Sequence, residues 1–305
     1  MTVTDRDPYV AFRDELVAAG LLLPTDAEGI YGRSGTFERV VAGVDALAAR
    51  LGETDGAAHR CFPPVEPRTV FERTGYLRSF PDLTGAVVTF VGDDRAHARL
   101  LATADAGDDW CHHLTPAGVV LCPAVCHQLY PTMAGTVPDD GALFHLQGWC
   151  FRHEPSPDPA RMQAFRMHEI VTAGTPEQAV AFRDRWVDRG LDVLRSLGLE
   201  VEAVVANDPF FGRVGQMLAA NQREEALKYE LVAEVADATK PTAIFSANYH
   251  QDHFGAPFGI TTPDGAVAHS ACVGFGLERI TLALFRRHGL DLDRWPAELR
   301  ARLAP

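Results

Sequence analysis

ALFHLQGWCFRHE (residues 142–154) and RMQAFRMHEIV (residues 161–171) are the two segments that decide the fold of this chain. The first alternates apolar and polar side chains, which is the period of a β-strand with one buried face. The second has the pattern of its antiparallel partner, and the polar loop PSPDPA lies between them. We therefore expect a hairpin with a long connection at the centre of an antiparallel sheet.

Strands and helices are predicted on both sides of this hairpin. Apolar runs predict strands, with GAVVTFV at 85–91 expected to be buried and GVVLCPAVCHQLY at 118–130 expected to run into a helix or turn. Later runs of the same kind are VEAVVA, YELVAEV, TAIFSANY and GAVAHSACVG. Apolar residues at helical spacing predict helices over 11–23, 36–51, 175–197 and 276–289. Antiparallel strands with flanking helices give an α+β fold class.

Composition limits the kinds of protein that this chain can be. With 305 residues, of which 47% are hydrophobic and 23% charged, it can bury a large core. It has neither an apolar run long enough to cross a membrane nor an N-terminal signal region, so we expect a cytoplasmic protein without a membrane partner. The formal charge of −13 argues against a tRNA-sized partner, because nucleic-acid affinity comes largely from Lys and Arg neutralising phosphates.

Six cysteines are too few for a disulfide framework in a chain of this length. They are expected to be core thiols or metal ligands. Packing as small apolar residues is the expectation for Cys61, Cys111 and Cys150.

Three motifs in order resemble the catalytic core of class II aminoacyl-tRNA synthetases, and specifically the seryl-tRNA synthetase branch, over about residues 30 to 295. The first is the helix at 36–51 followed by CFPPVEPRTVFERTGYLRSFP, where Pro63 or Pro64 matches the motif's proline. The second is CFRHE with the return strand RMQAFRMHE, and the third is GFGLERITLALF at 274–285. LKYELVAEV and SANYHQDHFG match segments between the motifs. The resemblance implies an antiparallel sheet flanked by helices, and a homodimer formed through the first motif.

Differences from the seryl-tRNA synthetase branch point to a smaller family that the chain resembles more closely. Only about 30 residues precede the first motif, so we expect no counterpart of the long tRNA-binding arm of seryl-tRNA synthetases, and we divide the chain into an N-terminal extension (1–30) and a catalytic domain (31–305). Where the branch has Thr-x-Glu for the substrate amine, this chain has Ala124-Val125-Cys126. An armless core with this replacement resembles the amino acid:carrier protein ligases, whose active site is similar to that of zinc-containing archaeal seryl-tRNA synthetases.

The resemblance implies a zinc site built from Cys126, Glu169 and Cys272. A catalytic zinc takes three protein ligands of these types and keeps one position for substrate, here the neutral amine of an amino acid. Cys122 is the alternative ligand because of its C-x3-C spacing with Cys126. For His250 and His253 we favour ordinary polar contacts over a second metal site, because i, i+3 spacing on a strand points side chains to opposite faces.

Roles in ATP binding follow by match to the motifs. Arg152 would hold the α-phosphate and the substrate carboxylate, and Arg279 the γ-phosphate, because a guanidinium forms paired charge-assisted hydrogen bonds to phosphate. Glu154 would accept from the adenine amine and Phe165 would stack on the ring. Magnesium would accompany ATP, with ligands that the sequence does not assign. Glu230 and Asn248 are candidate substrate-binding residues.

The function that the resemblance implies is ATP-dependent activation of a small amino acid and its transfer to the phosphopantetheine thiol of a carrier protein. Glycine or alanine is favoured, and serine or a non-protein amino acid stays open. The stretch from Arg213 to Lys228 and the helix at 175–197 are candidate docking sites for the carrier. The alternatives are an armless paralogue that charges tRNA or another acceptor, and a non-catalytic regulatory paralogue.

Overall fold

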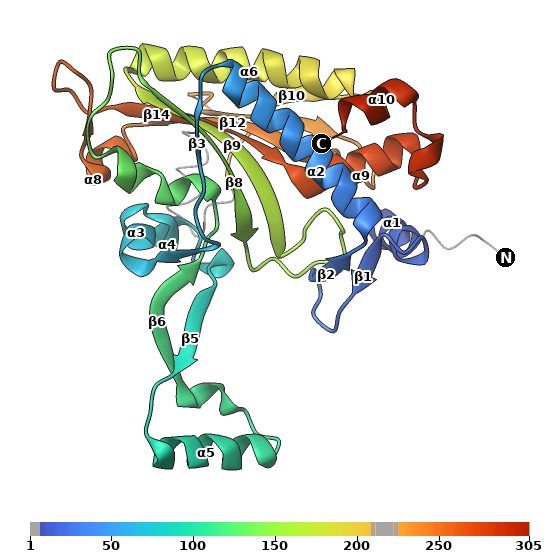
Figure 1. Ribbon diagram of the computed structural model, residues 1–305, viewed down its shortest axis with the longest axis vertical. Coiled ribbons are helices and arrows are strands. Elements are labelled where there is room, and N and C mark those ends of the chain that lie inside the picture. Colours follow the sequence, from blue (N-terminus) through green and yellow to red (C-terminus); the bar gives the residue numbers. More distant parts are fainter. Residues whose placement is uncertain (1–6, 209–210, 212–221, 223–224, 305) are drawn as a thin grey trace.

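The computed structural model describes residues 7–208, 211, 222 and 225–304. Its centre is a seven-stranded sheet with the strand order β10-β11-β12-β14-β9-β8-β3 (Figure 1). Neighbouring strands are antiparallel throughout, except that the edge strand β3 is parallel to β8. The strands of this sheet are β3 (Ala58–Arg60), β8 (Ala142–Phe151), β9 (Ala164–Gly174), β10 (Glu202–Val205), β11 (Lys228–Ala233), β12 (Thr242–Gln251) and β14 (His269–Gly276). The predicted α+β class with an antiparallel sheet is confirmed.

The predicted central hairpin is formed by β8 and β9, which pair in antiparallel register. Alternation along β9 sends His168 and Ile170 to one face of the sheet and Glu169 and Val171 to the other. One face therefore carries a helix-covered core, while the other is free to build a pocket.

Three amphipathic helices cover the core face: α2 (Gly35–Thr54), α6 (Pro176–Ser196) and α9 (Leu277–His288). They agree with the helices predicted from spacing. The side chain of Ser34 caps α2, and Thr175 with Gln178 forms a complete capping box on α6. Trp186 of α6 and Phe275 of β14 meet edge to face within this core, at 6.2 Å between ring centroids.

The N-terminal helix is shorter than predicted. It spans Pro8–Ala18 (α1), whereas the spacing of apolar residues had predicted a helix as far as residue 23. Gly20 adopts a positive φ of 68°, which ends the helical path, and Leu22–Pro24 (β1) pairs with Tyr31–Arg33 (β2) instead. Apolar side chains of this segment pack into the main core.

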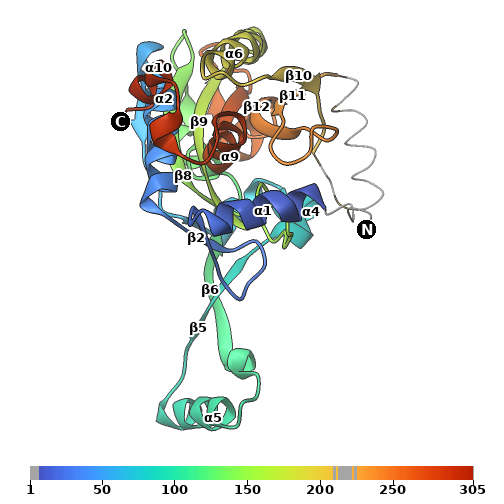
Figure 2. The same cartoon turned by 90° about the vertical axis from the view of Figure 1, so that its right-hand side faces the viewer.

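An arm projects from the body of the molecule. It consists of β5 (Ala86–Phe90), β6 (Leu114–Leu121) and α5 (Asp94–Asp105) at the tip, and both views show it standing away from the large sheet (Figures 1 and 2). The prediction of a buried strand at 85–91 is wrong, because Val88 is 46% and Val91 72% exposed. Among the described strands β5 pairs with β6 alone, in a small sheet to which β4 (Val65–Pro67) adds a third strand.

The remaining elements are short. They are α3 (Arg68–Arg73), α4 (Tyr76–Ser79), α8 (Gly255–Phe258), α10 (Ala297–Arg302), β7 (Gly135–Thr136) and β13 (Ile260–Thr261), with 3-10 turns η1 (Pro81–Leu83), η2 (Trp110–His113), η3 (Val125–Gln128), η4 (Tyr130–Met133) and η5 (Leu292–Arg294). None of the described helices is both long enough and apolar enough to cross a membrane.

Candidate functional site

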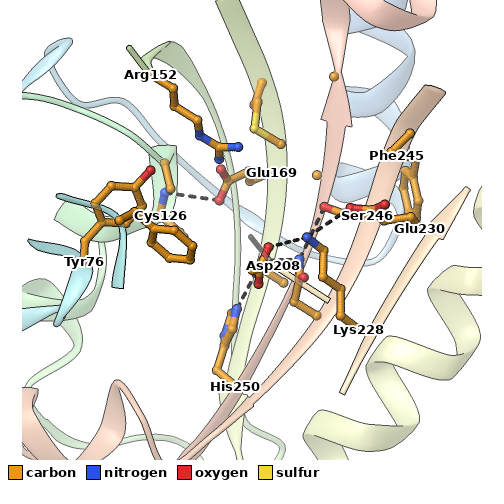
Figure 3. Close-up of a pocket in the computed structure, with 18 of the residues that line it drawn as sticks. Tyr76, Cys126, Arg152, Glu169, Asp208, Lys228, Glu230, Phe245, Ser246 and His250 are labelled. Carbon is orange, nitrogen blue, oxygen red and sulfur yellow. Dashed lines mark hydrogen bonds and ion pairs between the residues drawn. The ribbon is translucent and has the colours of Figure 1, made fainter. Parts of the chain in front are cut away.

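A cavity of about 600 Å³ lies on the sheet face opposite the three core helices. Its floor consists of alternate residues of β9, β11, β12 and β14, and its walls come from α4, η3 and the strand ends. Figure 3 shows Tyr76 and Cys126 on one side of this pocket and Lys228 and Glu230 on the other. Every site residue predicted from the sequence lines this cavity.

Three metal-ligating side chains converge in the pocket: Cys126 from η3, Glu169 from β9 and Cys272 from β14. Their ligand atoms lie within 4.8 Å of one another, and all three residues are buried. The backbone N–H groups of Val125 and Cys126 donate to the two carboxylate oxygens of Glu169, at 3.0 and 3.2 Å. These bonds tie the η3 turn to β9 and fix the carboxylate beside the thiols.

The three groups influence each other's protonation. A hydrogen bond between the two thiols and burial raise the pKa of Cys126, while the same hydrogen bond lowers the pKa of Cys272. Burial, with the charge of Cys272, raises the pKa of Glu169 to about 7. A buried set of like charges is costly unless a cation compensates it, so the cluster has the electrostatics of a cation site.

No second group of this kind occurs among the described residues. The thiol of Cys122, the alternative ligand, instead donates to the carbonyl of Ala124 at 3.1 Å. His250 and His253 make ordinary polar contacts, to Ser270 and to the carbonyl of Thr74. His250 nevertheless lies closer to the Cys126, Glu169 and Cys272 cluster than its i, i+3 spacing with His253 had suggested.

His250 lies beside the predicted ligands. Its Nε2 is 3.4 Å from the sulfur of Cys272, and its Nδ1 is 3.1 Å from the Ser270 hydroxyl. The shared strand parity of Ser246, Asn248 and His250 on β12 is the signal that could have placed this histidine on the pocket face.

Two cysteines were expected in the core and are not there. Cys61 and Cys111 are exposed, whereas Cys150 is buried as predicted. Cys111 belongs to the η2 turn on the arm, and Cys61 follows the edge strand β3, so neither has a core to enter.

Both predicted arginines point into the cavity with carbonyl partners. Arg152 donates through Nε to Pro123 at 3.1 Å, and Arg279 donates to Ala160 at 2.8 Å and to Ala243 at 3.0 Å. Among the described residues, neither forms an ion pair with a carboxylate. Burial, with repulsion from two neighbouring arginines, lowers the pKa of Arg279. Arginines without a direct carboxylate partner favour an anionic ligand.

The adenine and substrate candidates share this space. The guanidinium carbon of Arg152 lies over the Phe165 ring, 5.5 Å from the ring centroid. At the rim, a carboxylate oxygen of Glu154 lies 3.4 Å from a guanidinium nitrogen of Arg161. Asn248 donates to the Ser246 hydroxyl at 3.3 Å and lies 3.5 Å from the Cys272 sulfur.

Sequence reasoning missed a buried ionic network beside Glu230. Lys228 bonds Asp208 and lies 3.0 Å from Glu230, and Gln222 also bonds Asp208. Figure 3 shows Asp208 and Lys228 facing each other within the pocket. Lys228 and Glu230 alternate on β11, which is a signal for a shared face, but Asp208 reaches them from a loop.

The chain is 42% identical to amino acid:acyl-carrier-protein ligase 1 of Bradyrhizobium diazoefficiens over 97% of its length and 91% of that protein. Ligase 2 of the same organism is 43% identical over 97% of this chain and 89% of its own. This chain belongs to the amino acid:acyl-carrier-protein ligase family. A more distant relative of this ligase family member is the type-2 serine–tRNA ligase of Methanopyrus kandleri. It is 27% identical to this chain over 85% of this chain and 53% of its own length.

Solved structures show the fold of this ligase family member. The SerRS of M. kandleri, in complex with A. aeolicus tRNASec, superposes with a TM-score of 0.82 at 22% identity, over 96% of this chain and 60% of the longer one. Seryl-tRNA synthetase from Pyrococcus horikoshii, complexed with ATP, gives 0.69 at 16% identity, over 96% of this chain and 62% of that one. The fold is therefore that of class II synthetases. No profile of a known protein family matches the sequence.

Proposed function

We propose that this chain activates an amino acid with ATP and transfers it to the phosphopantetheine thiol of a carrier protein. The observation that carries the proposal is the likeness to two carrier-protein ligases over 97% of the chain. The pocket supports it, because a cluster of side chains that could ligate a metal ion faces the same space as two arginines that, among the described residues, have no direct carboxylate partner.

The chemistry needs two displacements. A carboxylate oxygen of the amino acid attacks the α-phosphorus of ATP, and pyrophosphate leaves with the bonding electrons. The phosphopantetheine thiol then loses its proton to solvent and attacks the carbonyl carbon of the adenylate, and AMP leaves as the C–O bond breaks. The protein's main contribution is to position these groups and to neutralise developing charge.

Cys126, Glu169 and Cys272 would hold Zn²⁺. Two thiolates and a carboxylate within a buried 4.8 Å cluster fit the donor set that zinc prefers, with a fourth position for the substrate amine. When bound, zinc supplies a Lewis-acidic position that selects an amine over a plain carboxylic acid. The backbone hydrogen bonds to Glu169 hold this ligand in place, as the surroundings of a metal site commonly do.

ATP would occupy the arginine side of the cavity with Mg²⁺ on its phosphates. Arg152 and Arg279 would bind the α- and γ-phosphates, Phe165 would stack on adenine and Glu154 would accept from its amine. Glu230 and Asn248 would bind the amino acid, since both line the cavity and Asn248 lies directly opposite Cys272 on the neighbouring strand.

We propose a small substrate, glycine or alanine, for the space beside the cluster. A Cβ built on Gly274 would lie 2.5 Å from the methyl carbon of Met167 and 3.8 Å from Cγ of Glu169, so the floor here is already close-packed. A surplus methylene in such a pocket costs about 1–3 kcal/mol.

We also propose a homodimer through the first-motif helix α2 and the edge strand β3. All three residues of β3 are exposed, and the strand pairs on one side only. An open edge strand is a template for pairing with another chain.

Amino-acid-dependent exchange of pyrophosphate into ATP, measured over a panel of amino acids, tests the activation step. We expect exchange with a small amino acid, and at least a hundredfold loss in Cys126→Ala and Cys272→Ala, together with loss of zinc by elemental analysis. Cys150→Ala is the matched control, because it removes a buried thiol outside the cluster.

The other possible results of these assays each contradict a different part of the proposal. Absence of exchange with every amino acid contradicts the enzyme proposal and leaves the regulatory paralogue. Exchange that survives both cluster substitutions contradicts the zinc proposal. Charging of tRNA without loading of a phosphopantetheinylated carrier favours the tRNA-charging alternative.

A further inference from the structure

The short helix α4 forms part of the rim of the cavity and faces two ways. Tyr76 and Ser79 line the cavity, and Figure 3 shows the Tyr76 ring beside Cys126. The intervening residues Leu77 and Arg78 are exposed, with Leu77 at 45%. The backbone N–H of Phe211, which is 59% exposed, donates to the Ser79 carbonyl at 2.8 Å. We call Leu77, Arg78 and Phe211 the α4 rim.

The α4 rim combines apolar surface with an unpaired positive charge. Among the described residues Arg78 has no acidic partner, although the whole chain carries a formal charge of −13. Two acidic side chains that line the cavity, Asp208 and Glu230, pair with Lys228 instead. Within the described part of the chain, Arg78 is therefore a cation beside the entrance without an acidic partner.

Two large exposed apolar side chains beside a functional cavity also need an explanation. Singly scattered apolar residues are ordinary on a surface, but the backbone N–H of Phe211 bonds the carbonyl of Ser79, two residues after Leu77, so both apolar residues belong to the same part of the rim. Apolar contacts with a cationic neighbour are typical of the centre of a protein–protein contact.

We propose that the α4 rim is the docking surface for the carrier protein, and that Arg78 pairs with the phosphodiester at the base of its phosphopantetheine arm. This inference rests on the proposed function. The thiol has to reach the reacting carbonyl inside the cavity, so the modified serine that bears the arm must sit at the entrance. A phosphodiester anion there is matched by a guanidinium, and apolar side chains flanking the modified serine pack on Leu77 and Phe211.

The structure argues against one of the two predicted docking sites and leaves the other as a prediction. The helix at 175–197, observed as α6, covers the sheet face away from the cavity (Figure 1). Most of the stretch from Arg213 to Lys228 lies outside the described residues.

The double variant Leu77→Ala/Arg78→Glu tests the proposal with three readouts: ATP–pyrophosphate exchange, transfer to a phosphopantetheinylated bacterial acyl carrier protein, and transfer to free pantetheine. We expect unchanged exchange, unchanged transfer to pantetheine, and a KM for the carrier raised about tenfold or more. The matched control is Arg300→Glu on α10, an equal charge reversal on an exposed residue distant from α4 in both views (Figures 1 and 2).

Two further measurements separate charge from general damage. Arg78→Lys keeps a cation and should restore most of the affinity for the carrier. Raising the ionic strength should raise the carrier KM of the wild type but leave that of the double variant almost unchanged, because screening acts on exposed charges.

The outcomes distinguish this surface from the function on which it rests. A wild-type protein that loads neither carrier nor pantetheine contradicts the proposed function, and the docking surface with it. If the wild type loads the carrier but the double variant has an unchanged KM, the docking surface alone is overturned. Equal losses with carrier and pantetheine would mean damage to the cavity, and an altered oligomeric mass would mean a contact between two copies of this chain; both also overturn it.

Discussion

The site is assembled from single residues whose side chains point to the same face of different strands. Glu230 on β11 pairs with Ser246 on β12, Ser246 with Gly274 on β14, and Gly274 with Glu169 on β9. Directly paired residues in antiparallel strands share a face, so this row crosses the floor of the cavity. Gly274 leaves space in the row, which Met167 partly fills.

Cysteine reactivity gives a prediction at this scale. Burial raises the pKa of Cys122 to about 12, so its thiol stays protonated and unreactive near pH 8, whereas Cys61 is exposed. Iodoacetamide treatment of the native protein at pH 8, followed by peptide mass spectrometry, should modify Cys61 at least tenfold faster than Cys122. The same reaction in concentrated urea is the control and should label both equally. Equal rates in the native protein would contradict the buried position of Cys122.

Among the elements, α6 illustrates how a local sequence signal controls a helix end. The hydroxyl of Thr175 accepts from the backbone N–H of Gln178, and the Gln178 side chain accepts from the backbone N–H of Thr175. The TPEQ sequence predicts this capping box, because the N-cap threonine, the proline and the glutamine follow one another at the start of the helix.

We expect removal of this N-cap to lower the stability of the protein measurably. Thr175→Ala leaves the N–H of Gln178 without its partner and should lower the free energy of unfolding by about 1 kcal/mol. Urea denaturation followed by circular dichroism measures the change. Thr175→Ser keeps the hydroxyl and should lie within a few tenths of a kcal/mol of the wild type. A loss in the serine variant equal to that in the alanine variant would argue against the capping role.

The arm shows the opposite case at the element scale. The apolar run at 85–91 forms a strand as predicted, yet its side chains face solvent. The pattern of residues predicts that a segment forms an extended strand, but whether the strand is buried depends on which other elements pack against it. Among the described strands, β6 alone pairs with β5.

At the scale of the whole molecule, the open edge of the large sheet leads to a prediction about assembly. Sedimentation equilibrium should give twice the mass of one chain. Ala58→Lys places a charge on the exposed edge strand β3 and should shift the equilibrium to monomer. Ala301→Lys is the control, because it adds the same charge to an exposed position of α10. A wild-type monomer, or an unchanged dimer in the Ala58 variant, would contradict the proposed interface.

The sequence by itself determined most of the strands, the long helices and the predicted site residues that gather in the cavity. These features follow from periodicity, capping signals and motifs, which are local or read one residue at a time. The tertiary structure alone decided that Cys126, Glu169 and Cys272 come within 4.8 Å, that His250 and the network of Asp208 and Lys228 border them, and that the strand at 85–91 leaves the core. The physical reason is that these properties depend on the register between strands far apart in the chain and on which surfaces other elements cover.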